Sequence, residues 1–192
     1  MRRRWGTAAD GYCGGREEVF DRRRCFLTAM PRDKMLTYVT VTPLHTEAPM
    51  HTTLELLATY CCAIFAGASI YIGAVEHPAR MSCGVKVALA EWAPSYRRAT
   101  VMQASLAVIG FGFALLAWLT GAELRYLVAG LLLVAVAPFT LIVIMPTNKR
   151  LMALDPNTDL DEAAVLLARW NRLHTVRSVL SATALVVFLW PY

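Results

Sequence analysis

Polar residues recur at helical spacing in three apolar stretches of the chain, toward one end of each stretch. The three sets are Ser69, Gly73, Glu76 and Arg80; Tyr96, Thr100 and Gln103; and Trp170, His174, Arg177 and Ser181. Neighbours within a set are three or four residues apart, so each set lies on one face of a helix. Histidine and carboxylate side chains transfer protons, and arginine stabilises negative charge. The spacing therefore predicts a shared polar pocket with residue types suited to acid–base chemistry.

An ionisable side chain inside a membrane costs several kcal/mol when it faces lipid, so such residues usually face a bundle interior or a wet cavity. The candidates for one pocket are Glu76, His77, Arg80, Gln103, Asn148, His174 and Arg177. Simpler explanations stay open for some of them. Glu76 can pair with Arg80 one turn on, His174 can be hydrogen-bonded in a helix contact, and arginines at helix ends can extend to phosphate headgroups.

The elements that carry these residues are predicted to cross a membrane. The chain has 192 residues, of which 57% are hydrophobic and 17% charged, and its mean hydropathy is +0.45. A soluble domain is nearer ~45–50% apolar and ~25% charged. Leu56–Val75, Val101–Ala122 and Tyr126–Asn148 are 20, 22 and 23 residues long without Asp, Glu, Lys or Arg, which is enough to span a bilayer. This composition excludes a disordered chain and argues against a soluble enzyme.

A fourth apolar run, Ser178–Tyr192, reaches spanning length if its helix begins near Trp170. We therefore expect an all-α fold, an integral membrane four-helix bundle with spans at about 54–75, 96–120, 125–146 and 170–190. Leu160–Leu173 has apolar residues at a period near 3.6, which predicts a short amphipathic cytoplasmic helix before the last span. Nine of the ten Lys and Arg after residue 50 lie in segments 76–99 and 146–177. The positive-inside rule then places loops 76–99 and 146–172 in the cytoplasm, at a bacterial inner membrane or an equivalent one.

Residues 1–49 differ from the rest of the chain. They contain two basic triplets, Arg2–Arg4 and Arg22–Arg24, and no helical or strand period, so we predict a disordered leader. This basic tail would lie on the outer side in the orientation above. Our hypothesis is that translation starts at Met50 and that the upstream part is an over-extended reading frame. Leu54–Phe65 also resembles the apolar part of a signal peptide, but the run continues to Val75 without a basic start.

Charge and cysteine content exclude two further classes of protein. The net charge of +5 divides into nine basic against six acidic residues before residue 50 and ten against eight after it, with no basic stripe interleaved with aromatics. We therefore expect no nucleic-acid partner. The five cysteines, Cys13, Cys25, Cys61, Cys62 and Cys83, contain no C-x-x-C pair. They predict neither a disulfide framework nor a zinc site.

Several short motifs at the helix ends resemble the anthrone oxygenase family of small four-helix membrane proteins. The motifs are FAGAS (65–69), VEHPAR (75–80), WAPSYRRA (92–99), MPTNKRL (145–151) and WNRLHTVR (170–177). The resemblance covers about Met50–Trp190. It implies the same fold and, for members with an assigned activity, oxidation of an anthrone to an anthraquinone with molecular oxygen. Most members have no assigned substrate, so the resemblance supports the fold more than the reaction.

Such an oxidation starts with the loss of an acidic ring CH proton, and it needs a base, a cation and an apolar slot rather than a cofactor. We expect His174 to take the proton, Arg177 or Arg80 to stabilise the oxyanion, and polar side chains to orient the phenolic oxygens. The predicted catalytic residues are His174, Arg177, Glu76 and Arg80; the predicted substrate-binding residues are His77, Tyr96, Gln103, Asn148 and Trp170. The expected partners are the lipid bilayer and a hydrophobic aromatic small molecule.

Two alternatives stay open at this point. In the first, Glu76, His77 and His174 hold a non-haem iron as two histidines and one carboxylate. Adjacent helical residues point about 100° apart, so this site needs Pro78 to distort the backbone. In the second, the protein is no enzyme but a small carrier or assembly partner, and its polar cluster is structural. That alternative predicts that Glu76, Arg80, His174 and Arg177 pair among themselves with no cavity beside them. The sequence leaves the oligomeric state open.

Overall fold

The computed structural model describes residues 50–190, which form helices joined by short turns. The elements are α3 (Met50–Tyr71), η1 (Ile72–Glu76), α4 (His77–Ser82), α5 (Val85–Leu119), α6 (Leu124–Val134), α7 (Val136–Phe139), η2 (Thr140–Ile144), α8 (Met145–Ala153) and α9 (Leu160–Leu189), where η marks a π-helical segment. These residues contain no strand, so the predicted all-α class is confirmed. The predicted leader, 1–49, lies outside the described residues.

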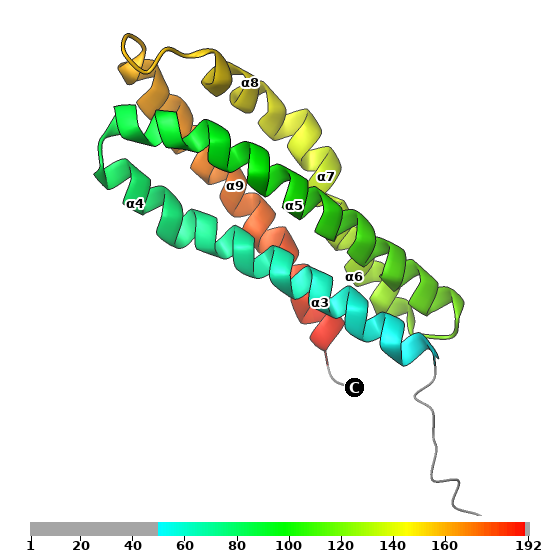
Figure 1. The fold of residues 1–192 in the computed structure, drawn as a ribbon. Helices are drawn as coiled ribbons and strands as arrows, with labels where there is room; N and C mark the ends of the chain where they lie inside the picture. Colours follow the sequence, from blue (N-terminus) through cyan, green and yellow to red (C-terminus); the bar gives the residue numbers. More distant parts are fainter. Residues whose placement is uncertain (1–49, 191–192) are drawn as a thin grey trace, which may run out of the picture. The chain divides into compact units, whose positions relative to one another are not determined.

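The elements join into four long helices that lie side by side (Figure 1). The helices are Met50–Ser82, Val85–Leu119, Leu124–Ala153 and Leu160–Leu189, and all four are long and apolar enough to cross a membrane. The most extensive contacts join α3 to α5, α5 to α6, α6 to α9 and α9 back to α3. The helices therefore form a closed ring, which confirms the predicted four-helix bundle.

Two of the long helices contain a π-helical segment shortly before a proline. η1 is followed two residues later by Pro78, and η2 two residues later by Pro146. The backbone N–H of His77 bonds to the carbonyl of Ile72, and that of Met145 to the carbonyl of Thr140. Proline has no N–H to donate to the preceding turn, and the wider i to i−5 turn lets the helix continue past it. The prolines thus lie inside helices instead of ending them.

The structure corrects the predicted boundaries at the basic end of the helices. The predicted loop 76–99 is helical apart from Cys83–Gly84, where Gly84 has a φ of 92° that favours glycine. α5 begins at Val85 and passes through Pro94, instead of starting near residue 96. Within segment 146–172, residues 154–159 alone are non-helical, and Leu160–Leu173 is the first part of α9. At about 1.5 Å per residue these helices are longer than the ~30 Å of a hydrocarbon core, and they continue through their charged turns.

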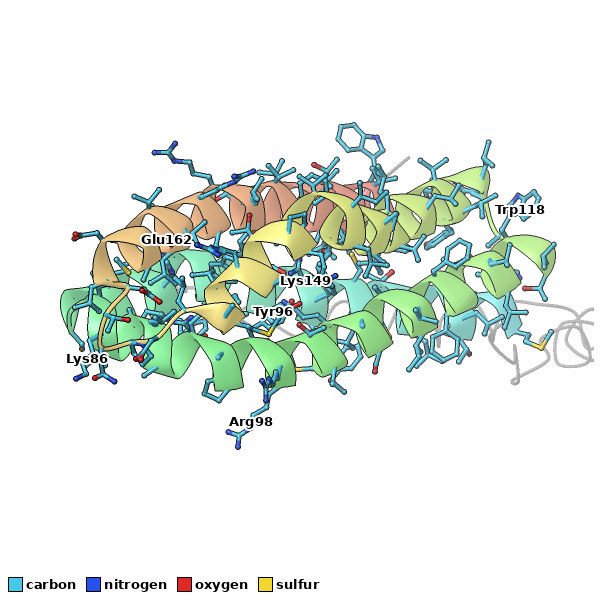
Figure 2. All side chains as sticks on the ribbon, turned by 90° about the horizontal axis from the view of Figure 1, so that it is seen from above. Lys86, Tyr96, Arg98, Trp118, Lys149 and Glu162 are labelled. Carbon is cyan, nitrogen blue, oxygen red and sulfur yellow. The ribbon has the colours of Figure 1, made fainter. Side chains whose placement is uncertain are left out.

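Two apolar cores occupy the two ends of the bundle. The alanine-rich core is Ala58, Cys62, Phe65, Ala107, Ala114, Tyr126, Ala129, Leu133, Val136, Ala184 and Phe188. The tryptophan core is Ile72, Ala88, Leu89, Trp92, Ile144, Leu151, Ala163, Leu167 and Trp170. The tryptophan core lies toward Lys86 and Glu162, and the alanine-rich core toward Trp118 at the other end (Figure 2). Buried polar residues lie between the two cores, and four of them, Ser69, Gln103, His174 and Arg177, form what we call the polar layer.

Candidate functional site

Most residues predicted for the site are buried. The buried ones are His77, Arg80, Gln103, Asn148, Trp170, His174 and Arg177, while Glu76 and Tyr96 are half-buried. Arg97, Arg98 and Arg172 are exposed, in line with side chains that extend toward headgroups. Figure 2 shows Arg98 pointing away from the bundle, whereas Tyr96 lies between α5 and the other helices. The helical stripes thus separate inward from outward residues as their spacing predicts.

A chain of hydrogen bonds links three helices through the polar layer. The Arg177 Nη2 donates to Gln103 Oε1 at 2.6 Å, and Gln103 Nε2 donates to Ser69 Oγ at 3.0 Å. The backbone carbonyl of Ser69 lies 2.9 Å from His174 Nε2. Ser69 belongs to α3, Gln103 to α5, and both ends of the chain to α9. Because His174 and Arg177 are three residues apart, one helix face presents both groups to the same region.

The hydrogen bond to the Ser69 carbonyl determines which nitrogen of the neutral His174 ring carries the hydrogen. A carbonyl oxygen only accepts, so His174 Nε2 carries the hydrogen, and in the neutral ring Nδ1 then bears the free lone pair. His174 Nδ1 is buried and has no hydrogen-bond partner in the described part of the chain. The ring stacks on Trp170 at 4.9 Å between centroids and 16° between planes. These contacts hold the imidazole in one orientation with Nδ1 available to accept a proton.

The two buried arginines differ in their partners. Arg80 forms ion pairs with Glu76 and, at 2.7 Å from its Nε, with Glu91. Arg177 is 7% exposed, yet no carboxylate of residues 50–190 lies within ion-pair distance of it, and its Nε has no hydrogen-bond partner there. Its contacts in the described residues are neutral: Gln103 and the ring of Phe65, whose centroid lies 5.8 Å from Arg177 Cζ. A buried cation without an anionic partner is costly, so Arg177 rather than Arg80 is the group suited to bind an anion or a developing oxyanion.

Two adjoining pockets border the polar layer. The first has a cavity volume of 20 Å³, room for one or two water molecules, and Arg80, Trp92, Trp170 and His174 contribute to its lining. The second has a cavity volume of 160 Å³ and is lined mainly by apolar residues of α5, α7 and η2. Four residues contribute to the lining of both pockets: Tyr96, Thr100, Gln103 and Arg177. The guanidinium of Arg177 therefore stands at the border between a narrow polar space and a wider apolar one.

Six of the nine predicted site residues line the first pocket: Arg80, Tyr96, Gln103, Trp170, His174 and Arg177. The other three, Glu76, His77 and Asn148, line neither pocket. Glu76 is paired with Arg80, the His77 ring lies 5.7 Å from that of Trp170, and Asn148 is buried in α8 without a partner for its side-chain atoms among the described residues. The sequence led us to expect an apolar slot but did not place it in the second pocket, although Thr140 in an otherwise apolar stretch was a signal for it.

The residues predicted as alternative iron ligands do not form a ligand set. Within residues 50–190, no three His, Cys, Asp or Glu side chains come close enough to hold a metal ion. Glu76 is engaged by Arg80 and Ser95, and His174 Nε2 by a backbone carbonyl. The donor set of a two-histidine, one-carboxylate site is therefore not assembled by Glu76, His77 and His174.

Fold and site together define a helical protein able to span a membrane, with a buried polar site between its helices. A family model described as anthrone oxygenase matches residues 92–187. An anthrone oxygenase of Claviceps purpurea is 28% identical over 143 residues, covering 67% of this chain and 82% of that protein. One from a Cryptosporiopsis species is 28% identical over 131 residues, covering 65% and 77%. No solved structure matches the chain. The chain belongs to the anthrone oxygenase family.

Proposed function

We propose that the protein is an oxygenase that converts an anthrone-like phenolic aromatic into the corresponding quinone with molecular oxygen. The observation that carries this proposal is the pair formed by His174 and Arg177. His174, with a buried base nitrogen, and Arg177, whose buried guanidinium has no carboxylate partner among the described residues, lie on one face of α9 and both line the narrow pocket. The names of the relatives supply the reaction class.

The first step is removal of a proton from the CH2 group of the anthrone. This carbon is flanked by two aryl rings and conjugated with the ring carbonyl, so its anion is delocalised onto that oxygen. His174 Nδ1 accepts the proton. Arg177 donates hydrogen bonds to the oxygen on which negative charge develops, in a site where few competing waters fit. These two groups meet the needs of the step without any further ionisable residue.

The second step uses molecular oxygen as the oxidant. The electron-rich anion passes one electron to oxygen, and the resulting pair combines into a carbon-bound peroxide, which takes the proton held by His174. The base then removes the second proton from the same carbon, the O–O bond breaks, and the carbonyl forms. The leaving hydroxide takes that proton and departs as water. One anthrone and one oxygen molecule thus give one quinone and one water.

Neighbouring residues position the two reacting groups. Gln103 and Ser69 hold Arg177 through their hydrogen bonds, and the stacked indole of Trp170 holds the imidazole of His174. A Cβ on Gly73 would lie 3.5 Å from the His174 ring, so α9 and η1 are in close contact there. Groups held this firmly need little reorganisation during the reaction.

The predicted assembly role accounts less well for this arrangement. It requires that Glu76, Arg80, His174 and Arg177 satisfy one another. Glu76 and Arg80 do pair with each other, but neither His174 nor Arg177 bonds to them in the described structure, and both line a pocket. This difference supports the enzyme proposal over a purely structural cluster.

The sidedness of the site is also a proposal. The basic end, with Lys86, Lys149 and the first turns of α9, would face the cytoplasm. The relatives named above are fungal, so they give no support to a bacterial inner membrane over an equivalent one. Cys83 is exposed in the turn before α5. In sealed vesicles with Cys13 and Cys25 replaced by serine, a membrane-impermeant maleimide should label Cys83 only from the cytoplasmic face; labelling from outside would reverse the orientation.

The test of the reaction is aerobic turnover of emodin anthrone by the purified full chain, with quinone absorbance and oxygen uptake followed together. The protein-free rate is subtracted because anthrones oxidise slowly unaided. We expect His174→Gln to lower the remaining rate by about a hundredfold or more, while His51→Gln, a matched change in the first turn of α3, leaves it unchanged. One oxygen should be consumed per quinone. A wild-type rate no higher than the protein-free rate would overturn the proposal.

A further inference from the structure

The second pocket runs from the outer surface of the bundle to the polar layer. Its lining includes Ala104 of α5 and Leu141 of η2, which are exposed, the latter by 63%. It also includes Phe65, which is buried in the alanine-rich core, and Arg177. Exposed residues in the apolar part of a spanning helix face lipid. The pocket therefore connects the lipid-facing surface, between α5 and the α7–η2 segment, with the guanidinium of Arg177.

The size and walls of this pocket suit a flat ring. Its volume of 160 Å³ is close to the about 150 Å³ of an apolar cavity that holds benzene. Three alanines, Ala104, Ala107 and Ala137, contribute to the walls, and their small side chains leave the space open. An aromatic compound of several fused rings is longer than the pocket, so its remaining rings would extend along the mouth toward lipid.

The charge at the inner end restricts the class of ligand. Arg177 lacks a carboxylate partner in the described residues and its Nε lacks any hydrogen-bond partner there. A lipid acyl chain could fill the apolar walls but would leave this cation uncompensated. A phenolic aromatic fills the same walls and brings an oxygen that carries or shares negative charge, which the guanidinium can bind.

We propose that this pocket is the entrance and first binding site for one ring of a phenolic polycyclic aromatic, which arrives from the bilayer between α5 and α7–η2 with a ring oxygen toward Arg177. His174 does not line this pocket, so the reaction proposed above requires the ring to move further inward, past Arg177. The class of ligand rests on the proposed function, whereas the place of the pocket does not. Apolar aromatics concentrate in membranes, so lateral entry brings the ligand to the site without passage through water. Ala104 and Ala137 then set how wide a ring the entrance admits.

The experiment measures binding without turnover. The probe is 1,8-dihydroxyanthraquinone, titrated by absorbance against the purified full chain in lipid nanodiscs, with empty nanodiscs subtracted. Ala104→Leu and Ala137→Leu each fill the pocket from a different helix, and Ala104 is exposed, so its substitution puts little strain on the core. Ala63→Leu is the matched control, because Ala63 is exposed on α3 and lines neither pocket. We expect Kd to rise at least tenfold in both pocket variants and to stay unchanged in the control.

The outcomes separate this inference from the reaction proposed above. Equal binding by all variants, equal losses in Ala63→Leu, or no binding by the wild type would overturn the pocket, even if emodin anthrone is still oxidised. Loss of binding in the two pocket variants alone supports the pocket, even if the wild type oxidises no anthrone, in which case the oxygenase proposal fails by itself. A thermal melt of each variant verifies that the Ala104→Leu protein is folded before its Kd is compared.

Discussion

The alanine-rich core and the polar layer lie next to each other in the same helices, but they differ in packing and polarity. The first is closely packed and apolar, and the second contains buried polar atoms without hydrogen-bond partners among the described residues. In the alanine-rich core, small residues bring helices very close: a Cβ on Gly130 would lie only 2.7 Å from the Cβ of Ala114. In the polar layer, His174 Nδ1 and Arg177 Nε are buried without a hydrogen-bond partner among the described residues. Close packing of small residues is a main source of helix association in membranes, whereas unpaired buried polar groups oppose it.

This difference indicates that the two regions have separate roles within one bundle. The alanine-rich core holds the helices together, and its stability offsets the cost of burying polar atoms of His174 and Arg177 without hydrogen bonds in the adjacent polar layer. Functional sites commonly reduce stability in this way. The comparison predicts that changes in the alanine-rich core affect folding more than chemistry, and that changes in the polar layer do the reverse.

The largest expected effect comes from Gly130→Leu. A side chain there meets Ala114 and also Phe111, whose Cδ2 would lie 3.3 Å from the new Cβ, so α5 and α6 must separate. We expect a loss of about 3 kcal/mol or more of stability, seen as loss of folded protein or a much lower melting temperature in detergent. Gly67→Leu is the control, since a Cβ there meets nothing within 4 Å. Equal melting temperatures for the two variants would contradict the role given to close packing.

The two buried arginines provide the next comparison. Arg177→Met removes an unpaired charge but leaves Gln103 Oε1 without its donor, so we expect little net change in melting temperature. Turnover should fall by about a hundredfold to a thousandfold, because the oxyanion loses its cation. Arg80→Met leaves Glu76 and Glu91 without their partner and should cost about 1–3 kcal/mol of stability with a smaller loss of turnover. The melting temperature and the turnover rate of both variants test this prediction. A larger loss of turnover in Arg80→Met than in Arg177→Met would contradict the catalytic role given to Arg177.

The sequence was sufficient to predict the four helices and the polar layer. Uncharged runs long enough to span a bilayer define the helices, and spacing of three or four residues places Gln103, His174 and Arg177 on inward faces. Which arginine lacks a carboxylate partner among the described residues was not predictable, because Glu91 reaches Arg80 from a different helix. The bonded nitrogen of His174 was not predictable either, because its partner is a backbone carbonyl, an atom that every residue has.

Two of the three predicted site residues that line neither pocket, Glu76 and Asn148, lie in or after a π-helical segment. A π segment adds one residue to a turn, so it rotates whatever follows by about 100° relative to a regular helix. Glu76 is the last residue of η1, and Asn148 follows η2. Neither lines a pocket, whereas Arg80, which also follows η1, lines the first one, so the π turn does not move every following residue out of the site. Proline at 78 and 146 marked the positions of the distortion, but its direction depends on hydrogen bonds that spacing does not specify.

Asn148 gives a smaller effect that tests whether this residue belongs to the site. Its side chain is fully buried, with both polar atoms unpartnered in the described part of the chain, between Ile144 and Leu151 of the tryptophan core. We expect Asn148→Leu to raise stability by about 1 kcal/mol, because it removes buried polar atoms that gain no hydrogen bond, and to leave turnover unchanged. Heat denaturation and emodin anthrone oxidation measure the two. A tenfold loss of turnover would return Asn148 to the site that its sequence position suggested.

The smallest effect concerns the exposed ion pair between α8 and α9. Arg150 Nε lies 2.5 Å from Glu162 Oε1, and both side chains are largely exposed. Water and salt screen such a pair, so Glu162→Gln should leave turnover unchanged and lower the melting temperature only slightly, with the difference disappearing at high salt. Glu76→Gln, which weakens the partly buried pair with Arg80, should keep its effect at the same salt concentration, because partly buried pairs are screened much less. If salt removed both effects alike, the Arg80–Glu76 pair would be as open to solvent as the Arg150–Glu162 pair. The predicted difference in shielding between the two ion pairs would then be wrong.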